Sequence, residues 1–147
     1  MLAITVNGRT YQAPHAPTVI ICIDGGDPAY FQDGFDRGLL PALQHFRAQG
    51  VFTTATAVIP TFTNPNNLSI VTGVPPAIHG ISGNFFLDPE SGTEVMMNDP
   101  RFLRAGSIHA ALSQHGRRVA VITAKDKLRR LLGHGVHQGI CFSAEKA

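Results

Sequence analysis

The longest apolar run of the chain covers residues 18–23, Thr-Val-Ile-Ile-Cys-Ile. Its lack of polar alternation leaves both faces apolar, which is typical of a central parallel strand that helices cover on both sides. The run stops abruptly at Asp24-Gly25-Gly26. The pattern therefore predicts an α/β domain built on a mostly parallel sheet with helices on both faces.

Helical and strand-like segments alternate along the rest of the chain. Helical spacing of apolar residues, often ended by glycine, indicates helices, and short apolar runs indicate further strands. The order predicts one βαβ unit early in the chain and a second helix–strand–helix series late in it. The expected helices are residues 39–49, 66–72, 107–115 and 126–132, and the expected extended segments are residues 51–59 and 118–122.

Two hairpins are also expected. Residues 3–12 alternate around Asn7-Gly8, a dipeptide that tolerates positive φ at both central positions of a type I′ turn. Residues 83–87 and 93–97 are joined by Asp-Pro-Glu-Ser-Gly, which is typical of a hairpin loop. The first hairpin is expected at the edge of the domain.

Composition excludes several classes of protein. The 147 residues are 44% hydrophobic and 15% charged with a net charge of +2, which fits one folded domain and excludes a disordered chain. The basic residues form no patch that would bind duplex nucleic acid. No run approaches the ~20 apolar residues that cross a bilayer, and the N-terminus lacks a signal-peptide pattern, so we expect a cytoplasmic protein without membrane association.

Asp24 is the first candidate functional residue. It directly follows the predicted strand at residues 18–23, where side chains of open α/β sheets often bind metals and phosphates. The alternative is an ordinary Asp-Gly turn. Asp27, which precedes Pro28, is interpreted as a helix N-cap.

Thr63 is the second candidate. It lies where the helix after Pro60 begins, and the positive end of a helix dipole favours an anion there. The alternative is that Thr63 or Asn64 only caps the helix. A threonine hydroxyl is a poor nucleophile at its own pKa, so a catalytic Thr63 needs a base or a metal ion.

The histidines and two lysines complete the set of candidates. His134 and His137 lie three residues apart in a glycine-rich loop, without Cys, Asp or Glu at ligand spacing, and are interpreted as solvated side chains, while His79 is interpreted as structural. Lys125 and Lys127 follow the strand at 118–122 and could hold an anion; a solvated loop is the alternative.

Three segments together resemble the opening of the alkaline phosphatase superfamily, and especially its nucleotide pyrophosphatase/phosphodiesterase branch. Both the residues of these motifs and their order along the chain agree with the family. The similarity covers nearly the whole chain, which corresponds to the front part of a much longer family domain. The segments are residues 19–25, residues 60–67, and residues 69–73 with His79-Gly80-Ile81, followed by Gly83-Asn84-Phe85-Phe86.

The resemblance implies roles for five residues. Asp24 corresponds to a zinc ligand, and Thr63 to the metal-bound nucleophile of a site that holds two zinc ions. Asn84 matches the asparagine whose amide holds a phosphoryl or phosphonyl oxygen. Lys125 and Lys127 match residues that meet the substrate carboxylate in members that cleave the carbon–phosphorus bond of phosphonoacetate.

The same resemblance predicts what is missing from these residues. The family completes its zinc site with downstream Asp and His residues, in patterns that do not occur before Ala147. We therefore expect residues 1–147 to be the N-terminal part of a single catalytic domain and to be inactive alone. The expected activity is zinc-dependent hydrolysis of phosphonoacetate; a phosphodiesterase of the same superfamily, an inactive anion-binding domain and a homodimer are left open.

Overall fold

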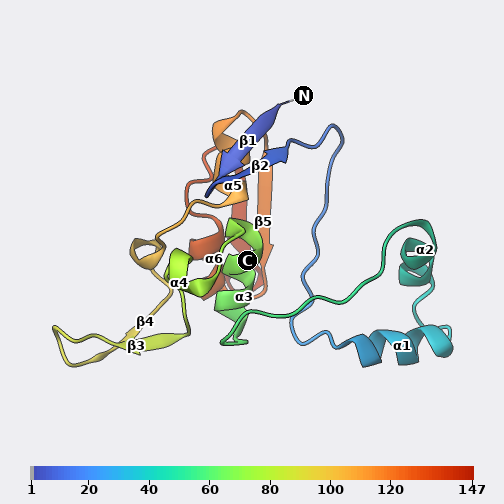
Figure 1. Cartoon of the computed structure of the whole chain (residues 1–147), viewed down its shortest axis with the longest axis horizontal. Helices are drawn as coiled ribbons and strands as arrows, with labels where there is room; N and C mark the ends of the chain where they lie inside the picture. The colour runs from blue at the N-terminus through green and yellow to red at the C-terminus, as the bar shows by residue number, and fades with distance from the viewer. Residues whose placement is uncertain (1) are drawn as a thin grey trace. The chain divides into compact units, whose positions relative to one another are not determined.

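The computed structural model describes residues 2–147, which divide into two compact units. The larger unit contains Met1–Pro17 and Ala57–Ala147, and the smaller unit is Thr18–Thr56. Each unit is described by itself, and Figure 1 gives the labels of its elements.

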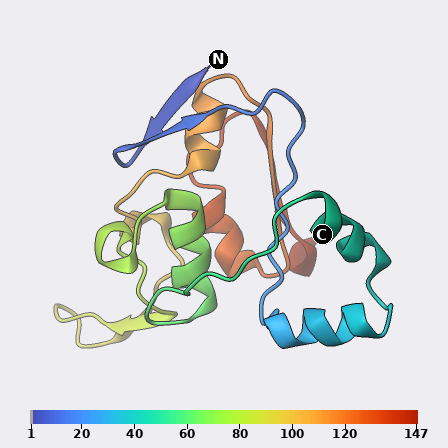
Figure 2. The same ribbon diagram turned by 45° about the vertical axis from the view of Figure 1, so that its right-hand side comes forward.

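The larger unit contains the hairpins, the parallel strand pair and most of the helices (Figures 1 and 2). Along the chain its elements are β1 (Ala3–Val6), β2 (Arg9–Gln12), α3 (Thr63–Thr72), α4 (Pro76–His79), β3 (Phe85–Leu87), β4 (Glu94–Met96), the 3₁₀ helix η1 (Pro100–Phe102), α5 (Ile108–Gln114), β5 (Val119–Thr123), α6 (Asp126–Leu132), β6 (Gly139–Ser143) and the 3₁₀ helix η2 (Ala144–Lys146). The smaller unit contains α1 (Pro28–Asp36) and α2 (Pro41–Gln49).

Strands β5 and β6 form a parallel pair connected through α6, with Val121 opposite Cys141. This β–α–β unit confirms the predicted strand at 118–122 to within one residue and the predicted helix at 126–132. The sequence did not predict β6. Its first residue, Gly139, has φ of +149° and lies so close to the Val119 carbonyl oxygen that any Cβ would overlap it.

The core of the larger unit joins α3 to this β–α–β unit. Leu68 of α3 and Ile81, which follows α4, are fully buried against Val121 of β5 and against Leu131 and Leu132 of α6. Figure 2 shows α3 beside α6, and the two helices are in contact. Helices α3 and α6 are therefore packed in the same hydrophobic core.

Both hairpins form as predicted. Asn7 and Gly8 have φ of 50° and 77° between β1 and β2, as a type I′ turn requires. The Asn7 amide donates to the carbonyl oxygens of Thr72 and Gly106, each at 2.8 Å, which ties this hairpin to the end of α3. Strands β3 and β4 pair antiparallel from Phe85↔Met96 to Leu87↔Glu94.

The prediction of strands at residues 18–23 and 51–59 is wrong for the described chain. Neither segment pairs in a strand, and Val19, Ile20 and Val51 expose 81%, 75% and 92% of their surface. A strand exists only when a neighbouring strand accepts and donates its ladder hydrogen bonds. Among residues 2–147 the sheets are three strand pairs, and none includes these segments, so the α/β class is confirmed while the parallel sheet is present only as β5 and β6.

The smaller unit confirms the predicted helix at 39–49 and the role of Asp27. Asp27 Oδ1 accepts a hydrogen bond of 2.8 Å from the Ala29 N–H, and Pro28 occupies the first helical position of α1. The guanidinium of Arg47 lies about 5 Å from the rings of both Phe35 and Phe52. No helix within the described residues is both long and apolar enough to cross a membrane.

Candidate active site

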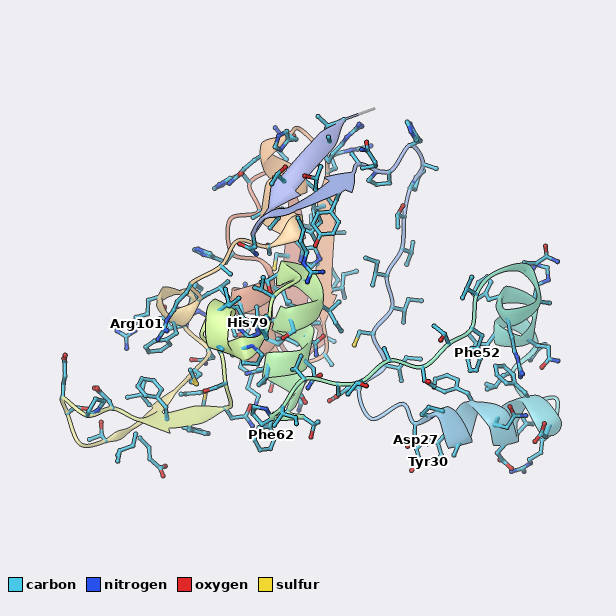
Figure 3. All side chains as sticks on the ribbon, viewed as in Figure 1. Asp27, Tyr30, Phe52, Phe62, His79 and Arg101 are labelled. Atoms are coloured by element: carbon cyan, nitrogen blue, oxygen red, sulfur yellow. The ribbon has the colours of Figure 1, made fainter. Side chains whose placement is uncertain are left out.

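Helix α3 begins at the proposed nucleophile. Thr63 is its first residue and is exposed, and the N-cap position belongs to Phe62, whose side chain has no oxygen to cap the helix (Figure 3). The alternative that Thr63 or Asn64 serves as the N-cap is therefore wrong. The Thr63 hydroxyl sits at the positive end of a ten-residue helix, where a developing negative charge is favoured.

The loop before Thr63 is fixed by the side chain of Asn66. Its Oδ1 accepts from the Val58 N–H at 3.0 Å, and its Nδ2 donates to the Phe62 carbonyl at 3.0 Å. Asn67 Nδ2 donates to the Thr63 carbonyl at 2.9 Å. Both asparagines belong to the sequence motif at residues 60–67, which predicts no role for either of them.

His79 lies behind α3 and has the structural role that the sequence predicted. Its ring is fully buried, and its Nδ1 accepts from the Ile81 N–H at 3.1 Å while Nε2 lies 3.0 Å from Ser69 Oγ. Burial lowers the pKa of His79, although a hydrogen bond to the Pro65 backbone acts in the opposite direction. The neutral ring therefore ties α4 to α3 (Figure 3).

Asn84 lies at the base of the β3–β4 hairpin. Its carbonyl accepts from the Met97 N–H at 2.8 Å, and its side chain is half-buried. Met96 and Asn98, on either side of Met97, line a pocket of about 690 Å³. Asn84 therefore pairs with Met97, and the two chain neighbours of Met97 line the pocket.

Lys125 and Lys127 line that same pocket, which opens at the start of α6. Its remaining lining residues are Met96, Asn98, Asp126, Arg129, Arg130, Glu145 and Lys146. Five cationic side chains therefore face two carboxylates. Such an excess of positive charge favours an anionic ligand.

Ion pairs occupy three of those five cations. Arg129 Nε lies 2.6 Å and Lys146 Nζ 2.9 Å from the Asp126 carboxylate, and Arg130 lies 3.1 Å from Asp99. The described residues form no ion pair with Lys125 or Lys127. These two lysines are therefore the pocket cations left to meet an anion from outside the chain.

The backbone that carries the lysines is held on both sides. Thr123 Oγ1 donates to the Lys125 carbonyl at 2.9 Å, and the Asp126 N–H donates to Glu145 Oε2 at 2.8 Å. Hydrogen bonds from Arg129 and Lys146 hold the pKa of the Asp126 carboxyl well below its usual range, so it stays ionised. The sequence did not identify Asp126 or Glu145 as residues that support the pocket, since Glu145 lies far along the chain.

Asp24 belongs to the smaller unit. Residues 23–26 form a turn in which the Gly26 N–H donates to the Ile23 carbonyl at 3.2 Å and Gly25 has φ of +73°. The turn alternative thus describes the backbone at Asp24, while its side chain is exposed. Thr63 belongs to the larger unit, so Asp24 and Thr63 are each described within their own unit.

A complete zinc site is not formed by the described residues. Residues 2–147 contain no group of three or more His, Cys, Asp or Glu side chains that could hold a metal ion. Asp24 and Thr63 offer one carboxylate and one hydroxyl, whereas a catalytic zinc ion takes about three protein ligands. His134 and His137 are exposed on the loop before β6, as the sequence predicted.

Comparison with known proteins places this geometry in a family. Two crystal structures of phosphonoacetate hydrolase from Sinorhizobium meliloti 1021, in complex with phosphonoacetate and with phosphonoformate, match 99% of this chain with a TM-score of 0.94, at 53% and 54% identity. The alkaline phosphatase-like fold is thereby confirmed. This chain covers 36% of the length of those chains.

Sequence relatives and a family model agree with the structural match. Human ectonucleotide pyrophosphatase/phosphodiesterase family member 1 is 39% identical over 75 residues, which are 50% of this chain and 8% of the human protein. The rat protein of the same name is also 39% identical over 75 residues. All these relatives are hydrolases. The family model described as type I phosphodiesterase/nucleotide pyrophosphatase matches residues 18–131, and the chain therefore belongs to that family.

Proposed function

We propose that this chain is part of a zinc-dependent hydrolase that cleaves the carbon–phosphorus bond of phosphonoacetate, with Thr63 as nucleophile. The observation that carries the proposal is the pocket in which Lys125 and Lys127 have no carboxylate partner among the described residues. High identity to an enzyme crystallised with phosphonoacetate supports the choice of substrate.

The two lysines would act on the leaving group. Expelling a carbanion from phosphorus is prohibitive unless the charge delocalises, and the neighbouring carboxylate of phosphonoacetate can take up that charge as an enediolate. Ammonium groups of Lys125 and Lys127 beside the carboxylate stabilise the enediolate more than the ground state. A phosphate ester without a carboxylate gains nothing from them.

Thr63 and Asn84 would act at phosphorus. Thr63 Oγ attacks, the carbon–phosphorus bond breaks, and the enediolate takes a proton to become acetate. The Asn84 amide and the N–H groups at the start of α3 donate to the phosphonyl oxygens as negative charge builds on them. Water then hydrolyses the phosphothreonine, which releases phosphate and restores the Thr63 hydroxyl.

Two zinc ions are part of the proposal, with Asp24 and Thr63 as the ligands that this chain would contribute. Zinc bound there would supply Lewis-acid chemistry that lowers the pKa of the Thr63 hydroxyl. Because the described residues lack the remaining donors, the proposal requires Asp and His ligands from outside them.

Phosphodiester or nucleotide pyrophosphate hydrolysis is the second candidate. It is favoured by the family model and by the human relative. Such an enzyme would use the same nucleophile, but it would need a slot for a base in place of a carboxylate subsite.

Kinetics with two substrates distinguish these candidates in the enzyme that contains this chain. Lys125→Ala and Lys127→Ala should each lower kcat/KM for phosphonoacetate by about 10- to 100-fold, the effect of one close charge pair, and change kcat/KM for 4-nitrophenyl phosphate by less than about threefold. Lys146→Ala is the matched control, because Lys146 lines the pocket but is paired with Asp126. An equal loss on both substrates, or a loss on neither, would contradict the carboxylate subsite.

A further inference from the structure

We infer that Asn66 is a positioning residue for Thr63, which it holds in place by clamping the loop on the N-terminal side of that residue. This inference rests on the proposed function, in which Thr63 is the nucleophile. Asn66 itself is not expected to touch the substrate, because its amide is already bonded to the backbone on both sides of the loop.

The clamp uses both halves of one amide. Asn66 Oδ1 accepts from the Val58 N–H at 3.0 Å, and Asn66 Nδ2 donates to the Phe62 carbonyl at 3.0 Å. The backbone N–H of Asn66 also donates to the Phe62 carbonyl, at 3.2 Å. Residues 59–61 are thus closed into a loop whose two ends meet on one side chain.

The anchored atoms are the immediate neighbours of the proposed reaction centre. Phe62 precedes Thr63 directly and is the N-cap of α3 without a side-chain cap of its own. The amide of Asn66 therefore fixes the carbonyl from which the peptide of Thr63 starts. Ordering this peptide before attack lowers the entropic cost of reaching the reactive geometry, because small displacements of a reacting group reduce rates strongly.

Asparagine is the side chain that this geometry requires. Aspartate would keep the acceptor for Val58 but would present a second acceptor to the Phe62 carbonyl, and alanine would lose both bonds. Asn67 offers a matched comparison, because its amide donates to the Thr63 carbonyl four residues earlier within the same helix and does not reach the loop.

The test combines kinetics with a structural measurement on the enzyme that contains this chain. Asn66→Ala should lower kcat for phosphonoacetate by about 10- to 100-fold and leave KM within about twofold, because a displaced nucleophile reacts slowly while the substrate still binds. Asn66→Asp should lose less. Amide hydrogen exchange at Val58 should become at least about tenfold faster in Asn66→Ala and stay unchanged in Asn67→Ala.

Each result supports or overturns the inference. Full kcat in Asn66→Ala together with fast exchange at Val58 would contradict the positioning role, as would an equal loss of kcat in Asn67→Ala. If Asn66→Ala does not fold, Asn66→Asp supplies the kinetic comparison, because it keeps the acceptor for Val58 and loses only the bond to the Phe62 carbonyl, and full kcat in Asn66→Asp would then contradict the clamp. Thr63→Ala separates a failure of the proposed function from a failure of this inference. Retained activity in Thr63→Ala contradicts Thr63 as the nucleophile. An inactive Thr63→Ala together with a fully active Asn66→Ala contradicts only the positioning role of Asn66.

Discussion

His79 Nε2 lies 3.0 Å from Ser69 Oγ, and this contact joins the short helix α4 to the middle of α3. Because the Ile81 N–H donates to Nδ1, the ring holds its proton on Nε2 and is neutral. A second proton would bind to Nδ1, and the resulting N–H would face the N–H of Ile81. The helix that carries Thr63 at its start is therefore braced by a histidine that must stay uncharged.

Stability should depend on pH through His79. Since the pKa of His79 is lowered in the folded state, its contribution is complete above the unfolded pKa of about 6.5 and is lost as the pH falls through the folded pKa. The free energy of unfolding, measured in urea at about pH 7.5 and about pH 5, should fall over this range in the wild type. His79→Gln should cost roughly 1–3 kcal/mol at the higher pH and flatten the dependence.

His15, which is exposed, provides the control for that titration. His15→Gln should keep the wild-type pH dependence. Asp88, Asp99 and Asp126 do not interfere in this window, because their carboxyl pKa values are lowered from 3.8. A wild type whose stability is flat between the two pH values would show that protonation of His79 is not coupled to unfolding.

Salt should weaken the binding of a carboxylated substrate. Lys125 and Lys127 are exposed, so ions screen their attraction for an anion once the Debye length falls from about 20 Å to a few ångströms, between about 0.02 M and about 0.5 M NaCl. KM for phosphonoacetate should rise several-fold while kcat changes little. The double variant Lys125→Ala/Lys127→Ala should show a much smaller rise, and an equal rise would mean that other charges bind the substrate.

The core beneath α3 should be sensitive to cavities. Leu68 is fully buried against Ile81 and Leu131, so Leu68→Ala should lower the free energy of unfolding by roughly 2–5 kcal/mol. Ile70, two residues along the same helix, is 62% exposed, and Ile70→Ala should change the stability by less than about 0.5 kcal/mol. Chemical unfolding of both variants checks the packing, and equal losses would contradict it.

Zinc should not bind stoichiometrically to the isolated chain of 147 residues. Its described part offers no cluster of three ligand side chains, and a zinc site needs about that number. Metal analysis after incubation with zinc and removal of excess should give less than one ion per chain, and the chain alone should not hydrolyse phosphonoacetate. Zinc-dependent turnover by these residues alone would contradict the proposed division of the ligands.

Local signals in the sequence were sufficient for much of the larger unit. The spacing and terminal residues of α3 and α6 and the Asn7-Gly8 turn predict elements that form at or near their expected bounds. Strand pairing is not local, so the apolar run at 18–23 could not say which strand would pair with it, and no strand among residues 2–147 does. Strand β6 was missed because its apolar run, Ile140 to Phe142, has only three residues and is too short to indicate a strand by itself.

In the candidate site, too, features set by local sequence were predicted and features set by non-local contacts were not. Thr63, Lys125 and Lys127 are predicted as candidates from their places at the ends of elements, and the structure confirms those places, while their roles stay predictions. Asn66 and the Asp126–Glu145 contact were not, because each depends on a side chain meeting backbone that periodicity does not bring together. Asp24 lies in the smaller unit and Thr63 in the larger one, and the local sequence at each predicts only its own turn or helix start.

Chemical quenching of the enzyme that contains this chain, during turnover of phosphonoacetate, tests most directly whether the Thr63 hydroxyl attacks phosphorus. Mass spectrometry of the quenched protein should find a phosphoryl group on Thr63, and Thr63→Ala should lack it and lose kcat by about 1000-fold or more, while Thr63→Ser keeps part of both. Turnover by Thr63→Ala near the wild-type rate, or a phosphoryl group on another residue, would contradict the account.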